Sequence, residues 1–128
     1  MNFYMNRIVD GTFEGAIERV TEALKTEGFG ILTEIDVQKT MKAKLGKDFR
    51  NYRILGACNP QLAFRALSAE DKIGVMLPCN VIVQQLDDGR IDVAAIDPQA
   101  AMESVGNTAL SEIAAVVREK LERVVVNF

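Results

Sequence analysis

The stretch that decides the fold runs from Asn80 to Asp97 and reads NVIVQQLDDGRIDVAAID. Two segments rich in branched apolar residues flank Asp87-Asp88-Gly89. An Asp-Gly pair between two such segments is a strong local signal for a β-hairpin, because glycine accepts the positive φ that a tight turn requires. The stretch therefore predicts two antiparallel strands, at 80–86 and 90–97, joined by a short turn.

The rest of the chain alternates between strand and helix patterns around this hairpin. Further strands are expected at 3–10, 29–36 and 50–57, and helices at 12–27, 37–45, 60–71 and 107–123. Thr12 and Asn59 are suitable N-caps, and Gly28 and Gly46 are suitable terminators. Residues 73–77 are expected to form a buried connector, 98–106 a loop, and 124–128 a tail that pairs with a sheet edge or a second subunit. This order predicts an α+β fold with helices packed on one face of a sheet.

The composition limits the class of protein. At 128 residues the chain has the length of one domain, so we expect a single domain over 1–128. Its net charge of −3 disfavours binding to nucleic-acid phosphates. No apolar run approaches the roughly 20 residues that span a bilayer, and the first residues do not resemble a signal peptide. We therefore expect a cytoplasmic protein that binds neither nucleic acid nor membrane.

Two short segments contain both cysteines, LGACNP at 55–60 and LPCN at 77–80. Cys58 precedes a helix capped by Asn59, and a helix N-terminus can lower a thiol pKa. Cys79 follows Pro78, which suits the first residue of a strand. If the two segments meet at one end of the sheet, paired thiols could bind a soft metal, exchange disulfides or bind a small electrophile.

A purely structural interpretation of the thiols is equally simple. Free cysteine is among the most buried residue types and packs as a small apolar side chain. The chain has no histidine, which excludes Ser-His-Asp and Cys-His catalysis within one chain. A zinc site needs four ligands and would require cysteines from two subunits, so no metal is predicted. No cofactor is indicated by the sequence.

A local cluster of positive charge lies between Met41 and Ile54. It consists of Lys42, Lys44, Lys47, Arg50 and Arg53. Such a cluster could attract a phosphate or a carboxylate, although solvated helix and loop charges explain it equally well. Lys44 and Arg53 are therefore included among the candidate ligand-binding residues.

Three segments carry a resemblance to a known family. They are EGFGILTEIDVQKTMKAKLG at 27–46, YRILGACNPQLAFRAL at 52–67 and IGVMLPCNVIVQQLDDGRIDVAAIDP at 73–98. Together they resemble the bacterial and archaeal family called domain of unknown function 302. The resemblance implies a TATA-binding-protein-like α+β fold, of the β-α-β(4)-α type. In that fold a curved, mainly antiparallel sheet carries two main helices on one face, with short helices added.

The resemblance also implies a homodimer, but no established activity. The positions that match its motifs are Cys58, Asn59, Pro60, Pro78, Cys79, Asn80 and Lys44. We therefore take Cys58, Asn59, Cys79, Asn80, Lys44 and Arg53 as the candidate ligand-binding residues.

Three functional hypotheses follow, and we rank them in this order. The first is a small ligand-binding or sensing domain with a cysteine-lined site for a small anion or a sulfur-containing ligand. The second is a structural or assembly module with buried thiols. The third is a thiol-dependent redox or sulfur-handling enzyme, in which Cys58 attacks and Cys79 resolves. The sequence leaves the presence of catalysis undecided.

Overall fold

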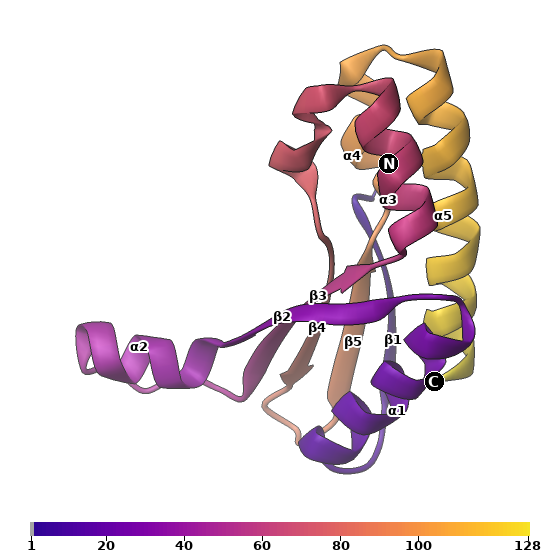
Figure 1. Cartoon of the computed structure of the whole chain (residues 1–128). Helices are drawn as coiled ribbons and strands as arrows, with labels where there is room; N and C mark the ends of the chain where they lie inside the picture. Colours follow the sequence, from indigo (N-terminus) through magenta and orange to yellow (C-terminus); the bar gives the residue numbers. More distant parts are fainter. Residues whose placement is uncertain (1) are drawn as a thin grey trace.

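A five-stranded antiparallel sheet organises the chain in the computed structural model, which describes residues 2–128 (Figure 1). Its spatial order is β1-β5-β4-β3-β2, and each strand is antiparallel to its neighbours. The strands are β1 (Tyr4–Val9), β2 (Gly30–Asp36), β3 (Tyr52–Cys58), β4 (Cys79–Gln85) and β5 (Ile91–Ile96). The predicted hairpin is confirmed as β4 and β5, with Gly89 at a φ of 89° in the turn.

Two long helices cover one face of the sheet, which confirms the predicted α+β class. They are α1 (Phe13–Thr26) and α5 (Thr108–Asn127). The inward-facing residues of β4 and β5 alternate with outward-facing ones, and Val81, Val83 and Val93 are fully buried beneath the helices. This apolar layer is the core that holds the sheet and the helices together.

Helix boundaries follow the capping signals in the sequence. The Thr12 side chain accepts a hydrogen bond from the Gly15 amide at the start of α1, and Gly28 follows the helix with a φ of 84°. Asn59 caps α3 (Pro60–Ala69) by accepting from the Leu62 amide, with Pro60 in the first turn. These predicted caps are confirmed, and they satisfy amides that a helix start leaves unpaired.

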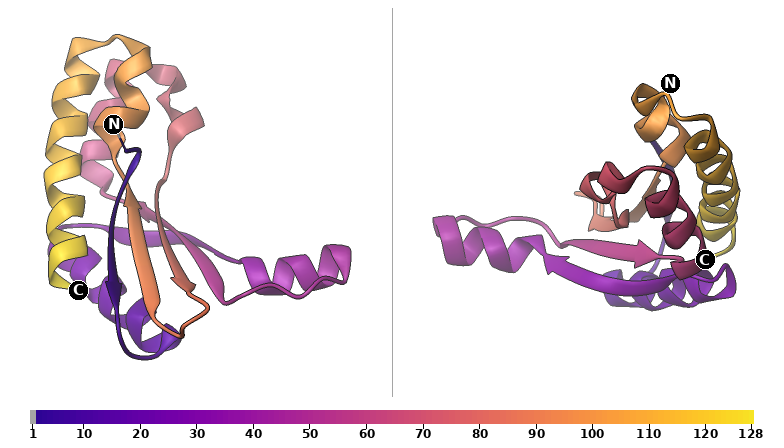
Figure 2. Two further views of the ribbon diagram at one scale, coloured as in Figure 1. Left: turned by 180° about the vertical axis from the view of Figure 1, so that it is seen from behind. Right: turned by 45° about the horizontal axis from the view of Figure 1, so that its top comes forward.

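The helix α2 (Val37–Leu45) extends away from the rest of the molecule at the end of β2 and β3 (Figures 1 and 2). Asp36 caps its start and Gly46 ends it in the left-handed conformation. None of its residues is buried. In all three views α2 lies on the side opposite to α5, so it projects from the sheet on the side that α1 and α5 leave uncovered.

The expectation of a loop at 98–106 is wrong. These residues form α4 (Pro98–Met102) and a short 3-10 turn, η2 (Glu103–Val105). The Asp97 side chain caps α4 and Pro98 begins it, which is the same signal that marks the start of α3. The connector at 73–77 is also helical, as the 3-10 helix η1 (Asp71–Met76), and its Ile73 is buried as expected.

The expectation that the tail pairs with a sheet edge is also corrected, because residues 124–127 continue α5 as helix. Contact of the tail with a second subunit stays a prediction. Val124 and Val125 extend the apolar stripe of Leu121 by one turn and are buried. Arg7 of β1 holds this end, because its guanidinium donates to the backbone oxygens of Val125 and Phe128 at 2.8 and 2.6 Å. Packing of the stripe therefore overrides the strand propensity of three consecutive valines.

Within residues 2–128, no helix has both the length and the apolar character needed to cross a membrane.

Candidate functional site

Cys58 and Cys79 lie at the same end of the sheet. Cys58 is the last residue of β3 and Cys79 is the first residue of β4. The two strands are neighbours, and Ala57 pairs directly with Cys79. Both thiols are free, and both line one cavity. The structure therefore brings together the two cysteine segments, which are separated by twenty residues along the chain.

The cavity lies where α3, α4 and α5 gather over the end of the sheet (Figure 1). Its volume is about 330 Å³, near the lower end of the range typical of small-molecule sites. Its apolar wall includes Phe29, Leu62, Leu77, Met102, Ile113 and Val117. Among the described residues that line it, none is charged, and Asn59 is the one amide. The cavity therefore offers an apolar surface with two soft sulfur atoms.

Burial determines the chemistry of the Cys79 thiol. Removal from water raises the pKa of Cys79 to about 11, and the neighbouring Cys58 adds to the increase. Low polarity penalises the charged thiolate and leaves the neutral thiol favoured. Cys79 is therefore uncharged at neutral pH, which suits an apolar wall better than a nucleophile or a metal ligand.

The two asparagines that follow the cysteines have different surroundings. The Asn59 side chain lines the cavity, yet both of its polar atoms are already used. Its Oδ1 accepts from the Leu62 amide at 3.3 Å, and its Nδ2 donates to the Glu27 carbonyl at 3.4 Å. Asn80 points to the opposite face of the sheet, since successive residues of a strand alternate, and it lines a separate groove there. Asn80 thus lies outside the cavity that contains Cys79.

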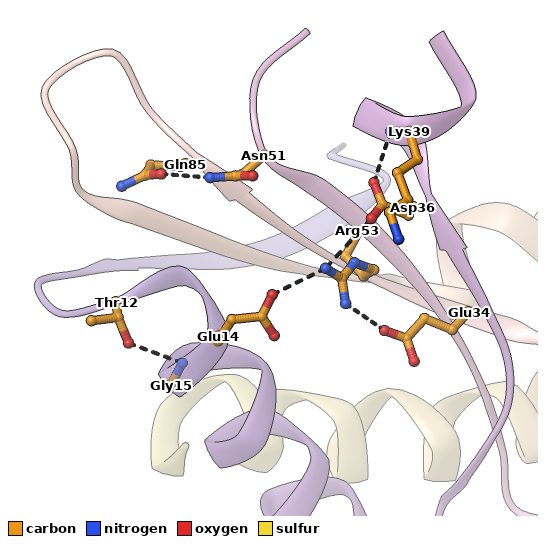
Figure 3. A network of polar contacts seen from close by, with 9 residues as sticks. All are labelled: Thr12, Glu14, Gly15, Glu34, Asp36, Lys39, Asn51, Arg53 and Gln85. Atoms are coloured by element: carbon orange, nitrogen blue, oxygen red, sulfur yellow. Dashed lines mark hydrogen bonds and ion pairs between the residues drawn. The ribbon is translucent and has the colours of Figure 1, made fainter. Parts of the chain in front are cut away.

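Arg53 lies at the other end of β3, roughly 17 Å from Cys58 along the strand. Its guanidinium bridges α1 and β2 (Figure 3): Nη1 lies 2.7 Å from Glu34, and Nη2 lies 3.1 Å from Glu14 and 3.7 Å from Asp36. Burial lowers the pKa of Arg53, but the hydrogen bond with Glu34 and the three carboxylates more than offset this and raise it. The side chain therefore links α1 to the end of β2 that leads into α2.

Lys44 is an exposed residue of α2 and lies on the projecting helix, away from the sheet end where the cysteines meet. The six candidate residues therefore divide among four places. Cys58, Asn59 and Cys79 share the cavity, whereas Asn80, Arg53 and Lys44 each lie elsewhere.

The residues that sequence reasoning missed include wall residues of α3, such as Leu62, and of α4 and α5. Pro98 and Met102 of α4 line the cavity together with Ile113, Ala114 and Val117 of α5. The Asp97-Pro98 pair was the available signal, because it repeats the Asn59-Pro60 start of α3. Among residues 2–128, no group of three or more cysteine and carboxylate side chains gathers closely enough to hold a metal ion.

Comparison with known proteins agrees with this fold. Residues 5–128 match the model of a family described as domain of unknown function DUF302. A crystal structure described as an uncharacterized conserved DUF302 protein from Bacillus stearothermophilus is 33% identical in sequence. It superimposes with a TM-score of 0.92, over 99% of this chain and 98% of that chain. No curated protein matches the sequence.

Proposed function

The chain belongs to the DUF302 family, whose description assigns no activity, and we propose that it is a small ligand-binding or sensing domain for an uncharged, largely apolar molecule. The observation that carries this proposal is the composition of the cavity beside Cys58 and Cys79. Its walls are mostly hydrocarbon, with two sulfur atoms and the Asn59 amide. A concave apolar surface of this kind favours the burial of an apolar ligand.

The absence of charge among the described lining residues favours an uncharged ligand. A small anion, which the sequence suggested, would lose its hydration and find no cation among the described residues of the wall. Lys44 and Arg53 do not reach the cavity, and Arg53 is already neutralised by carboxylates. An uncharged ligand loses little hydration free energy on entering the cavity. Polarizable sulfur atoms favour contact with an aromatic or sulfur-containing group.

The cysteines support binding better than catalysis. A resolving cysteine acts as a thiolate, and burial raises the pKa of Cys79 well above neutral pH. The raised pKa of the buried Cys79 thiol also fits the alternative, a structural module with buried thiols. It differs from the binding hypothesis in one respect, because it requires no guest in the cavity.

Titration with a neutral fluorescent probe, 1-aminoanthracene, distinguishes the two. Ala66→Leu fills the cavity, since Ala66 is 4% exposed and lines it. We expect this variant to weaken probe binding at least ~10-fold, which is about 1.4 kcal/mol. Ala43→Leu adds the same methyl groups to exposed α2 and should leave the affinity unchanged. Equal affinity of Ala66→Leu and the unchanged chain, with both folded by circular dichroism, would reject the proposal.

Two further features complete the proposed function. We place the protein in a reducing compartment such as the cytoplasm, which the two free thiols support. We also propose that it acts as a homodimer. The sheet face opposite to α1 and α5 supports this, because Tyr4 and Ile8 are exposed on it at 39% and 42%.

A further inference from the structure

The segment from Val37 to Arg50, called the arm below, contains a helix that the rest of the chain does not support. The helix α2 has nine residues, none of them buried, and its main contacts with the sheet are to β2 and β3. Isolated helices shorter than about 12–15 residues are marginal in water. A helix this short therefore gains stability if another surface covers it.

The arm presents both apolar and charged groups to such a surface. Val37, Met41 and Leu45 recur every four residues and lie along one side of α2. Leu45 is 63% exposed, whereas Val37 and Met41 are half-buried. The arm contains five basic residues and one acidic residue, a net charge of +4. The remaining residues then hold ten basic against seventeen acidic side chains, a net charge of −7.

The opposite net charges of the arm and of the remaining residues favour a second copy of this chain as the partner. A membrane with anionic lipids or a nucleic acid would attract the arm but repel the rest of the molecule, which carries the larger and opposite charge. The remainder of a second copy has the complementary sign. A reciprocal exchange of arms also satisfies the twofold symmetry of the commonest homodimers, in which each copy contributes the same pair of surfaces.

The uncovered face of the sheet contains a groove that suits the arm. This groove has a volume of about 410 Å³ and is lined by Tyr4 of β1, Tyr52 of β3, Ile82 of β4 and Ile96 of β5. Asp92 also lines it, and its carboxylate accepts hydrogen bonds from the Asn6 and Gln84 amides at 2.9 and 3.0 Å. Asp92 has no ion-pair partner among residues 2–128, so it can receive a lysine from outside.

We propose that the arm of one copy docks into the groove on the sheet of a second copy, and that the contact is reciprocal. Val37, Met41 and Leu45 fill the apolar part of the groove, and the arm lysines lie near Asp92 of the partner subunit. The arm projects on the same side of the sheet as the groove, which allows two copies to face each other (Figure 2). This inference rests on the homodimer proposed above and assigns its surfaces.

Sedimentation velocity of the whole chain tests the contact. The double variant Met41→Glu and Leu45→Glu removes two apolar anchors without touching the core, and we expect the dimer dissociation constant to rise ~100-fold or more. The control is Phe64→Glu with Val75→Glu, which adds the same charge at two sites exposed at 73% and 88% outside the arm and the groove. Its dissociation constant should stay within a few-fold of the unchanged chain.

The results of these measurements distinguish a failure of arm docking from a failure of the proposed homodimer. A monomeric unchanged chain at all concentrations would overturn both. A dimer that persists in the Met41→Glu, Leu45→Glu variant would overturn arm docking alone. A photoreactive benzoyl-phenylalanine at position 45 identifies the receiving surface: cross-links to β1, β3, β4 or β5 of the partner are expected, whereas cross-links confined to other elements would reject the groove.

Discussion

Ala57 of β3 lies directly opposite Cys79 of β4 in the antiparallel ladder. Ala57 and Cys79 therefore line the same cavity, and Cys58, the last residue of β3, lines it as well. The position of both thiols thus depends on the register of two central strands rather than on a flexible loop. A register fixed by a buried sheet face is difficult to shift, since a slip of one residue would turn the apolar side chains outward.

The Cys79 thiol should react slowly with alkylating reagents. Its pKa of about 11, against 9.0 when exposed, lowers the thiolate fraction at pH 8 by about 100-fold. Iodoacetamide labelling of the Cys58→Ser variant, followed by mass spectrometry, isolates Cys79. We expect at least this ~100-fold difference between the folded and the urea-unfolded protein, because burial also limits access. Equal rates would contradict the burial of this thiol.

The same pKa predicts a pH dependence of stability. Between pH 9 and 11 the unfolded chain loses the Cys79 proton while the folded chain keeps it, so the free energy of unfolding falls as pH rises. The loss is at most about 3 kcal/mol for a shift of this size. Urea titrations should show a steeper decline for the unchanged chain than for Cys79→Ala, whose other titrating groups are identical. Parallel curves for the two would show that Cys79 is not the source.

Arg53→Gln should destabilise the protein by about 1–3 kcal/mol. The substitution leaves Glu14, Glu34 and Asp36 near one another without the cation that bridges them. Adding Glu34→Gln to this variant should recover part of the loss, since one of the repelling charges disappears. Lys25→Gln is the control, because the Lys25 pair with Glu22 is exposed and should contribute little. Urea midpoints measure all four proteins.

Asp97→Ala should reduce both stability and binding to the cavity. Asp97 is 5% exposed, and its Oδ1 accepts from the Gln99 and Ala100 amides at the start of α4. Its Oδ2 accepts from Arg118 Nε of α5 at 3.0 Å. Loss of the cap and of the ion pair should cost about 2–4 kcal/mol. Because α4 lines the cavity, 1-aminoanthracene affinity should fall as well, and unchanged affinity in the folded variant would contradict the role of α4 in the cavity wall.

Gly56→Ala should destabilise the end of the sheet that carries the cysteines. A Cβ at this position would overlap Thr33 Oγ1 and lie 2.7 Å from Pro78 Cγ. Such overlap typically costs about 1–3 kcal/mol. The double variant with Thr33→Ala should recover only part of the loss, because the ring of Pro78 cannot rotate away. Full recovery by Thr33→Ala would show that Pro78 imposes no constraint.

Local sequence signals predict much of this fold. The Asp88-Gly89 turn, the Asn59-Pro60 start of α3 and the Gly46 end of α2 each act within a few residues, and each is found in the structure. The start of α4 also has a local signal, the Asp97-Pro98 pair, which we interpret from the sequence as a strand end. The error at the end of α5 has a different origin. The stripe through Leu121, Val124 and Val125 is helical because α1 and β1 cover it, and that contact lies more than a hundred residues away in the chain.

The candidate site is predicted only in part for the same reason. Two similar motifs suggest that Cys58 and Cys79 could meet at one end of the sheet, and the register of β3 and β4 brings them to the same end. Lys44 and Arg53 are close to Cys58 in sequence but not in space, because β3 is extended and α2 projects beyond its far end. Local signals mark the starts of α4 and α5, but the packing of these helices over the cavity is long-range.

The most direct test of the central claim is a crystal structure of the protein soaked with bromobenzene. The account predicts anomalous bromine density inside the cavity, in van der Waals contact with the Cys58 or Cys79 sulfur, and no such density in Ala66→Leu crystals. Ordered water filling the cavity, with bromine found only on the outer surface, would contradict an apolar ligand site at this position.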